Sequence, residues 1–289
     1  MIVKDNTPKA IFLIIFGMSI FAFQDALIKY LSFDTNIFLI YLVRAFVGLS
    51  LLVLFLYIKN EPIIFKTHYP TLTILRGVIF FLSFTLYYFS LSKLSLAKAI
   101  TLFFVSPFFI TIFSVILLKE VIGFQRWFAL IIGFIGVYLV MEPDFNNFDI
   151  YSTFPILCAL GYALTMIIQK ITSDKDNLYS QVFHLYFAAI FFSLIIGAFT
   201  ADGKFYDPND IEFNFLLHPW NINNFSNLLF LFLIGIITVL GFLSVFQAYR
   251  IGSPPSVAPF EYILIVWAIL IGWIFWNEIP DIKSIIGIA

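Results

Sequence analysis

The stretch SVAPFEYILIVWAILIGWIFWNE, residues 256–278, is an almost continuous apolar run. A helix needs about 20 mostly apolar residues to cross a bilayer, and this run is long enough. Two carboxylates belong to it: Glu261 lies well inside the run and Glu278 ends it. A charge at the membrane centre costs about 2.5–3.5 kcal/mol on insertion scales. The stretch therefore predicts a membrane helix whose inner glutamate faces a partner or a cavity and not the lipid.

The composition of the whole chain indicates a membrane protein. Of its 289 residues, 62% are hydrophobic and only 11% are charged, whereas about 25% of the residues of a soluble domain are charged. Such a chain cannot cover its surface with polar groups, so we predict an all-α integral membrane protein. The formal net charge of −1 gives no reason to expect nucleic acid as a partner. The single cysteine, Cys158, excludes a disulfide within the chain.

Nine apolar runs are long enough to span a bilayer, and they are continuous, which favours helices over barrel strands. Their approximate ranges are 10–31, 36–58, 70–92, 95–118, 124–141, 150–171, 179–199, 225–249 and 254–277. The first run is expected to remain as a span, because no small-residue cleavage site follows it. A tenth run begins near Asp281 and reaches only Ala289, so we expect the last helix to be incomplete in this sequence.

The lysines and arginines predict the orientation, since they gather in the short cytoplasmic loops of membrane proteins. With the N-terminus in the cytoplasm, most of these residues lie on the cytoplasmic side. The long polar loop 200–224, with a short turn expected at Phe213 to Leu217, then lies outside. We therefore expect a multi-pass protein of the bacterial inner membrane with a cytoplasmic N-terminus.

Two parts of the chain share a pattern at an offset of 158 residues. SLAKAITLFFVSPFFITIFSVILLKE ends at Glu120, and SPPSVAPFEYILIVWAILIGWIFWNE ends at Glu278, while Ser95 corresponds to Ser253. Each copy would hold five spans, and an odd number inverts the second copy in the membrane. The pattern predicts ten transmembrane helices as two inverted five-helix repeats, residues 1–145 and residues 146–289, the second truncated in its last helix. Inverted repeats are typical of alternating-access transporters.

On these residues the chain resembles the drug/metabolite transporter superfamily, with its EamA-type domain present twice. The resemblance is carried by LSLAKAITLFFVSPFFITIFSVILLKEVIGFQRWFALIIGFIGVYL in the first half and by APFEYILIVWAILIGWIFWNEIPDIKSIIG in the second. In the short segments QDALIKYL, VRAFVG, LRG and NEIPD, the chain is most similar to the group that contains S-adenosylmethionine uptake transporters. The resemblance implies ten helices, both termini in the cytoplasm and a central cavity lined by both repeats, and it leaves the substrate open.

The depth of a charged residue inside a span can be read from the sequence, at about 1.5 Å of rise per residue along the helix. Asp25 and Arg44 fall in the outer half of the membrane, and Asp25 is expected to pair either with Arg44 or with Lys29. Arg76 and Glu261 fall at matching depth in the inner half and are expected to neutralise each other. Each pair either contributes to a substrate site or is a fixed salt bridge that locks helix packing.

Two further features are expected to shape spans 95–118 and 254–277. Glu120 and Glu278 end these spans, and we expect them to make structural polar contacts at the start of a neighbouring helix. Pro107 and Pro259 lie inside the spans and are expected to interrupt helical hydrogen bonding. Carbonyls freed at such a break can face a cavity.

Polar-tipped aromatic and amide side chains complete the predicted cavity, which would suit a small zwitterionic or cationic metabolite because cations bind to ring faces. The candidate substrate-binding residues are Gln24, Asp25, Arg44, Arg76, Tyr87, Tyr88, Tyr162, Gln247, Glu261, Tyr262 and Trp267.

Motifs for an enzyme are missing from the sequence. The three histidines are widely separated and there is no phosphate-binding loop, so we expect no enzyme activity, no catalytic residue, no metal and no cofactor. We predict a secondary-active transporter of a small organic, amino-acid-like metabolite, with S-adenosylmethionine as one candidate. An exporter of amino acids or drugs from the same superfamily and a membrane scaffold without transport remain alternatives. The direction, the coupling ion and the choice between monomer and homodimer stay open.

Overall fold

A computed structural model of the chain describes residues 6–124, 127–128, 131–132, 135, 149–208, 213–221 and 225–278. Within these residues the regular structure is entirely helical, and eight helical segments are long and apolar enough to cross a membrane. The predicted all-α membrane class is confirmed. Eight of the nine complete spans are found, whereas most of the span expected at 124–141 and all of the tenth lie outside the described residues.

The first half of the chain forms four of the eight segments. Asparagine and serine side chains cap three of these helices, because their oxygens accept hydrogen bonds from backbone N–H groups of the first turn, as Asn36 does from Phe38 N at 2.8 Å. The helices are α1 (Thr7–Leu31), α2 (Ile37–Lys59), α3 (Pro70–Leu91), α4 (Leu96–Phe103) and α5 (Ser106–Leu118), and α4 and α5 together make one segment.

The second half contributes the other four segments. Asn177 caps the helix that follows it, with its Oδ1 2.6 Å from Ser180 N. The expected turn at Phe213 to Leu217 is a short helix. The elements are η1 (Ile150–Ser152), α7 (Thr153–Thr172), α8 (Leu178–Thr200), α9 (Asn214–Leu217), α10 (Phe225–Ile251), α11 (Pro254–Val257), η2 (Ala258–Tyr262) and α12 (Ile263–Trp276).

The breaks expected at the two prolines are present. The chain leaves the helix between α4 and α5, just before Pro107, and tightens into the 3₁₀ segment η2 at Pro259. The two interrupted segments also end alike: Lys119 and Asn277, at the offset of 158, both close their helices in the left-handed conformation, with φ of 57° and 52°. The two segments therefore share local geometry as well as sequence pattern.

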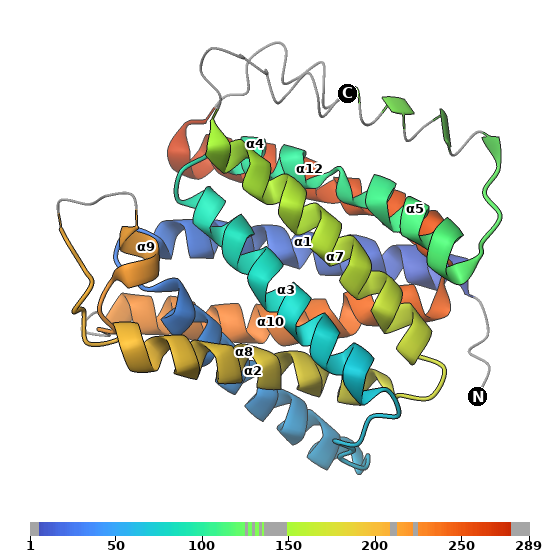
Figure 1. Cartoon of the computed structure of the whole chain (residues 1–289), viewed down its shortest axis with the longest axis horizontal. Coiled ribbons are helices and arrows are strands. Elements are labelled where there is room, and N and C mark those ends of the chain that lie inside the picture. Colours follow the sequence, from blue (N-terminus) through green and yellow to red (C-terminus); the bar gives the residue numbers. More distant parts are fainter. Residues whose placement is uncertain are drawn as a thin grey trace.

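Helices from the two halves pack against one another. In Figure 1, α3 and α7 lie side by side in front of α1 and α10, and α2 and α8 pack together at one side of the bundle. Further packing joins α2 with α10, α3 with α8, α1 with α12, α4 with α12 and α5 with α7. Each of these pairs joins one helix of the first half to one helix of the second.

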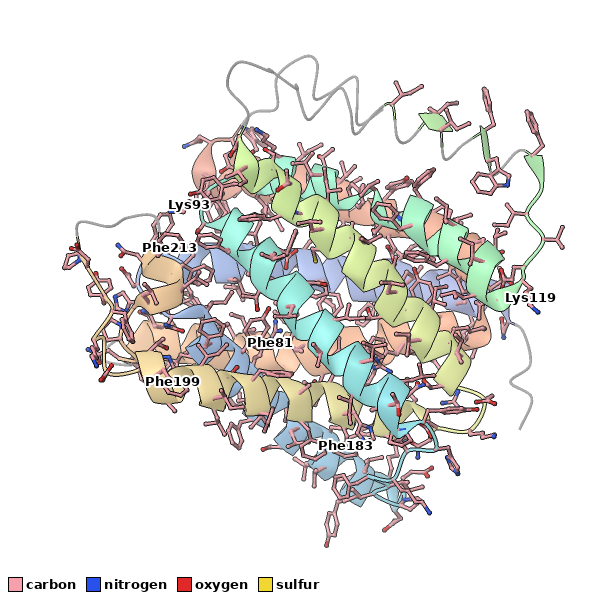
Figure 2. The ribbon with its side chains drawn as sticks, viewed as in Figure 1. Phe81, Lys93, Lys119, Phe183, Phe199 and Phe213 are labelled. Carbon is pink, nitrogen blue, oxygen red and sulfur yellow. The ribbon has the colours of Figure 1, made fainter. Side chains whose placement is uncertain are left out.

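Lysine side chains lie at both ends of the bundle, and aromatic side chains lie between them (Figure 2). Figure 2 shows Phe81 at mid-height, whereas Lys93 and Lys119 lie at opposite ends. Large apolar side chains such as Phe46, Phe191 and Phe275 are exposed on the sides of the helices. A lateral surface of this kind suits the hydrocarbon core of a bilayer.

At one end of the bundle, Asp176 joins the α2–α3 connection to the α7–α8 connection. Its carboxylate accepts hydrogen bonds from Thr67 Oγ1 at 2.5 Å and from His68 N at 2.8 Å. Burial raises the pKa of Asp176, but these hydrogen bonds outweigh burial and bring the pKa below its usual range. The carboxylate is therefore ionised at neutral pH and ties the two halves together.

The two terminal glutamates make the structural contacts expected of them. Glu278 Oε2 accepts from Leu96 N at the start of α4 at 2.9 Å, and Glu120 Oε2 accepts from Ser253 Oγ before α11 at 3.0 Å. These contacts confirm the prediction. Proline follows Ser253 and has no N–H, so the Ser253 hydroxyl donates instead. Glu278 Oε1 also forms an ion pair with Lys29 Nζ at 3.1 Å, so the alternative pairing of Lys29 with Asp25 is wrong.

Candidate functional site

A cavity of about 50 Å³ lies between helices of both halves. Its lining comes from α1, α2, α3 and α4 of the first half and from α7, α10 and α12 of the second. A cavity needs roughly 10–15 Å³ to hold one water, so this one has room for a few waters. The predicted candidates Gln24, Asp25, Arg44, Tyr87, Tyr88 and Tyr162 all line it.

One part of the lining is polar and carries two opposite charges. Asp25 on α1 and Arg44 on α2 are 6% and 4% exposed. Asp25 Oδ2 accepts a hydrogen bond from Tyr87 OH at 3.0 Å, and Arg44 Nη1 donates to Tyr88 OH at 3.1 Å. Two adjacent tyrosines of α3 therefore hold the carboxylate and the guanidinium.

The expected ion pair between Asp25 and Arg44 is not formed, because no oxygen of Asp25 lies within 4.0 Å of a nitrogen of Arg44. The guanidinium instead lies over two aromatic rings, 4.2 Å from the Tyr41 centroid and 5.3 Å from the Tyr88 centroid. Stacking on rings stabilises a desolvated guanidinium without a carboxylate partner. Both charges thus line one cavity without a direct salt bridge to each other.

Gln24 extends this polar network across the two halves. Its Nε2 donates to Tyr88 OH at 3.0 Å, and its Oε1 accepts from Thr238 Oγ1 on α10 at 2.6 Å. Sequence reasoning missed Thr238. The only available signal was its hydroxyl group inside a long apolar run, and such a hydroxyl usually bonds to its own helix, as Thr238 also does to Ile234 O at 2.6 Å.

The rest of the lining is aromatic and apolar. Phe84 meets Tyr162 edge to face at 6.1 Å between centroids, and Phe103 lies 5.3 Å from the same ring. Phe242 and Phe246 stack in parallel at 5.4 Å on α10. Sequence reasoning missed these phenylalanines, because the chain holds 39 of them and composition does not show which ones face a cavity.

Glu261 lies apart from the cavity lining, in η2, and is 1% exposed. Its Oε1 accepts hydrogen bonds from Tyr162 OH at 2.7 Å and from Tyr249 OH at 2.5 Å. The same Tyr162 ring also lines the cavity, so this residue connects Glu261 with the cavity.

The predicted pair between Arg76 and Glu261 is wrong. Arg76 Nη2 donates to the backbone oxygen of Gln181 on α8 at 3.0 Å, and its guanidinium lies 4.8 Å from the Phe246 ring. Equal depth placed both residues at one height, but their side chains point to different neighbours. Arg76 therefore joins α3 to α8 and lies outside the cavity lining.

The remaining candidates also lie outside the lining. Gln247 borders a shallow groove at the bundle surface beside Lys9 and Arg250. Tyr262 packs edge on against Phe104 at 5.1 Å, and Trp267 Nε1 donates to Ser19 Oγ at 2.9 Å. In this conformation Tyr262 and Trp267 hold helices together.

The cavity can offer three kinds of interaction to a ligand. Asp25 supplies an anion, Arg44 supplies a cation with a fork of donors, and the aromatic walls supply ring faces. Buried charges interact strongly with a ligand because there is little water to screen them. A molecule that carries an ammonium group, a carboxylate and a flat or cationic side group would engage all three.

Known proteins similar to this chain include several transporters. An S-adenosylmethionine uptake transporter of Rickettsia prowazekii (strain Madrid E) is 26% identical over 266 residues, which cover 91% of this chain and 83% of that protein. The pseudopaline exporter CntI of Pseudomonas aeruginosa (strain PAO1) is 25% identical over 99% of this chain and 94% of its own length. A riboflavin transporter of Vibrio cholerae is 27% identical over 66% of this chain and 58% of its own length.

The fold and the family agree with these similarities. A crystal structure of a protein with 15% sequence identity superposes with a TM-score of 0.69 over 96% of this chain and 91% of that chain, which shows a shared fold. The EamA-like transporter family matches residues 8–142 and again residues 150–289. The chain therefore belongs to the EamA-like transporter family, within the drug/metabolite transporters.

Proposed function

We propose that this chain is a secondary-active transporter that moves a zwitterionic or cationic, amino-acid-like metabolite across the inner membrane by alternating access. The observation that carries the proposal is the pair of buried, opposite charges that line one aromatic cavity without pairing with each other. Asp25 would receive the ammonium group of the ligand, and Arg44 would receive its carboxylate. Arginine binds a carboxylate with two parallel hydrogen bonds, which fixes the ligand's orientation.

S-adenosylmethionine is the first substrate to test. It carries an amino-acid group for Asp25 and Arg44, and its adenine and sulfonium groups would suit the rings of Phe84 and Tyr162. Relatives in Rickettsia are named for the uptake of this compound. Since the identity to them is 26%, the substrate and its direction of transport are part of the proposal.

Export of an amino-acid-like compound is the second candidate function. It is favoured by the similarity to a pseudopaline exporter over 99% of this chain. A cavity between two halves can be loaded from either side, so the geometry at Asp25 and Arg44 serves import and export alike.

The architecture proposed for this function is ten helices in two inverted repeats, residues 1–145 and 146–289. The helix packing supports this architecture. In the two proposed repeats, α1 corresponds to α7, α2 to α8 and α3 to α10. The α1–α10 pair then corresponds to the α7–α3 pair, and the α2–α10 pair corresponds to the α8–α3 pair. The α2–α8 pair corresponds to itself, and the α4–α12 pair corresponds to the α11–α5 pair. In the same way, the contact of Glu120 with Ser253 in one repeat is the counterpart of the contact of Glu278 with Leu96 in the other.

The size of the cavity supports alternating access. A volume of about 50 Å³ does not hold a metabolite, so the helices around Asp25 and Arg44 must separate to admit one. Two halves that pack as equivalent units can move against each other on either side of the site. One copy of the chain contains the whole proposed site, and a monomer and a homodimer both fit this mechanism.

Ligand-induced stabilisation of the purified protein tests the substrate. S-adenosylmethionine should raise the melting temperature in a concentration-dependent way, because a ligand at 100 times its Kd adds about 2.7 kcal/mol of stability. S-adenosylhomocysteine, a neutral thioether that lacks the sulfonium methyl group and its positive charge, should stabilise less. 5′-Methylthioadenosine, which lacks the amino-acid group, should stabilise least. If no amino-acid-bearing solute raises the melting temperature or enters proteoliposomes, the proposed substrate class is wrong.

The proposed orientation is tested with two single cysteines in a Cys158→Ala background. Lys175→Cys lies in the α7–α8 connection and Lys204→Cys in the connection after α8, and both positions are exposed. Each replacement removes one lysine charge, so the two variants are matched. In intact cells, an impermeant thiol reagent should label Lys204→Cys and spare Lys175→Cys until the cells are opened. Equal labelling of both positions in intact cells would contradict the proposed topology.

A further inference from the structure

Only one of the two carboxylate oxygens of Glu261 has hydrogen-bond partners. Its Oε1 accepts two tyrosine hydrogen bonds, whereas Oε2 is buried without a hydrogen-bond partner. The Ser106 hydroxyl, at the first turn of α5, also lacks a regular hydrogen bond and lies within interaction range of this carboxylate. Two unpartnered polar groups therefore meet where the breaks of the two interrupted segments pack together.

No cationic side chain among the described residues forms an ion pair that would neutralise Glu261. The neighbouring elements α5, α11 and α12 contain no charged residue, and the titratable groups beside the carboxylate are Tyr162 of α7, Tyr249 of α10 and Tyr262 of η2 itself.

The charged residues of the other packed helices are engaged elsewhere. On α1, Lys9 is exposed, Asp25 lines the cavity, and Lys29 pairs with Glu278. Lys170 of α7 donates to the backbone oxygens of Arg250 and Gly252, and Arg250 of α10 donates to the backbone oxygen of Asp176.

From this geometry we infer that Glu261 is a proton-binding site that couples the transporter to the pH gradient across the membrane. The inference rests on the proposed transport function. A carboxylate inside the membrane without a cation is costly, and a bound proton removes the charge. Protonation on Oε2 also turns an unpartnered acceptor into a donor, and the Ser106 hydroxyl lies within interaction range of the carboxyl group. The site thus offers a proton a defined place.

A metal cation fits this site less well. Sodium and similar hard cations require several oxygen ligands, and Glu261 Oε1 is already occupied by two tyrosine hydroxyls. The unpartnered side-chain oxygens at this position are Glu261 Oε2 and Ser106 Oγ. Two oxygens suffice for a proton and not for a metal ion.

Tyr162 would carry the coupling. Its hydroxyl bonds to Glu261 while its ring lines the substrate cavity against Phe103. A charged Glu261 holds this hydroxyl more strongly than a neutral one, because hydrogen bonds to ionised acceptors are stronger. Phe103 occupies the position that corresponds to Glu261 at the offset of 158, so the proton site would exist in only one repeat.

Infrared spectroscopy of the purified protein tests the proton site without any substrate. The wild type should show the carbonyl band of a protonated carboxyl group that disappears at high pH, and Glu261→Gln should lack this band. Asp25→Asn is the control, because it removes the other buried carboxyl group within the described membrane spans and should leave the Glu261 band in place. A wild type without such a band, or a band unchanged in Glu261→Gln, would overturn the inference.

Tyr249→Phe gives a second reading if Glu261→Gln fails to fold. It removes one hydrogen bond that favours the ionised carboxylate, so the Glu261 band should persist to a pH higher by roughly one unit or more. An unchanged midpoint would mean that the titrating group is not Glu261.

Transport separates this inference from the proposed function. In proteoliposomes, a pH gradient should drive accumulation of labelled S-adenosylmethionine by the wild type at least tenfold more than by Glu261→Gln. Exchange of internal for external S-adenosylmethionine at equal pH should persist in Glu261→Gln within about threefold, because exchange requires no release of the proton. Exchange by the wild type without any response to a pH gradient, or to a sodium gradient only, would overturn proton coupling. The absence of all transport would instead overturn the proposed function.

Discussion

Asparagine in place of Asp25 is expected to lower uptake of S-adenosylmethionine by about a hundredfold. Removing one partner of a buried, hydrogen-bonded charge pair costs roughly 2–5 kcal/mol, and 1.4 kcal/mol is a factor of ten. The ligand's ammonium group would lose its anion in a site with little water to replace it. The fold should survive, because the asparagine side-chain oxygen can still accept the hydrogen bond that Tyr87 OH now donates to Asp25.

Arg44→Lys is the matched replacement on the other side of the site. It keeps the charge but loses the fork of donors and the flat surface that stacks on Tyr41 and Tyr88. We expect uptake to fall at least tenfold, with a smaller loss than for Asp25→Asn, because the attraction to the ligand's carboxylate partly remains.

Ligand-induced melting shifts separate recognition from structure in these two variants. Binding of 5′-methylthioadenosine, which has no amino-acid group, should change less than threefold in Asp25→Asn, whereas the shift caused by S-adenosylmethionine should be lost. If both compounds lose affinity equally, or if S-adenosylmethionine retains its affinity, Asp25 does not recognise the ammonium group.

The height of a residue in the membrane could be predicted from the sequence, but the direction of its side chain could not. A fixed rise per residue placed Arg76 and Glu261 at the same depth. Whether they meet depends on helix packing, and Arg76 points to α8 while Glu261 points to tyrosines of α7 and α10. For Asp25 and Arg44 the depth was sufficient to indicate a shared cavity, because one cavity collects residues from several directions at that height.

Contacts between helix ends were easier to predict than contacts inside the bundle. Glu120 and Glu278 each end a span beside a short polar connection. The start of a neighbouring helix was therefore the nearest place where the carboxylate could accept a hydrogen bond. Inside the bundle, the phenylalanines of the cavity wall have the same residue type as those facing lipid. Phe84 lines the cavity and Phe46 is exposed, and only tertiary packing distinguishes them.

The contact between α3 and α7 gives the largest expected effect on stability. Gly161 of α7 lies against Ser83 of α3, and a Cβ atom at position 161 would overlap the Ser83 hydroxyl and lie 2.9 Å from its Cβ. Helices in membranes approach closely where residues are small, because the attraction between them comes from packing. Gly161→Ala should therefore push apart two helices that line the cavity.

Overpacking of a tight core costs about 1–3 kcal/mol, so we expect Gly161→Ala to lower the melting temperature by roughly 5 °C. Gly123→Ala is the matched control, because a Cβ there meets no atom within 4 Å and should leave the melting temperature unchanged. Ser83→Gly combined with Gly161→Ala should restore most of the stability, since it removes the atoms that clash. If Gly161→Ala has the same melting temperature as the wild type, or if Ser83→Gly does not restore it, α3 and α7 do not pack as closely as this contact requires.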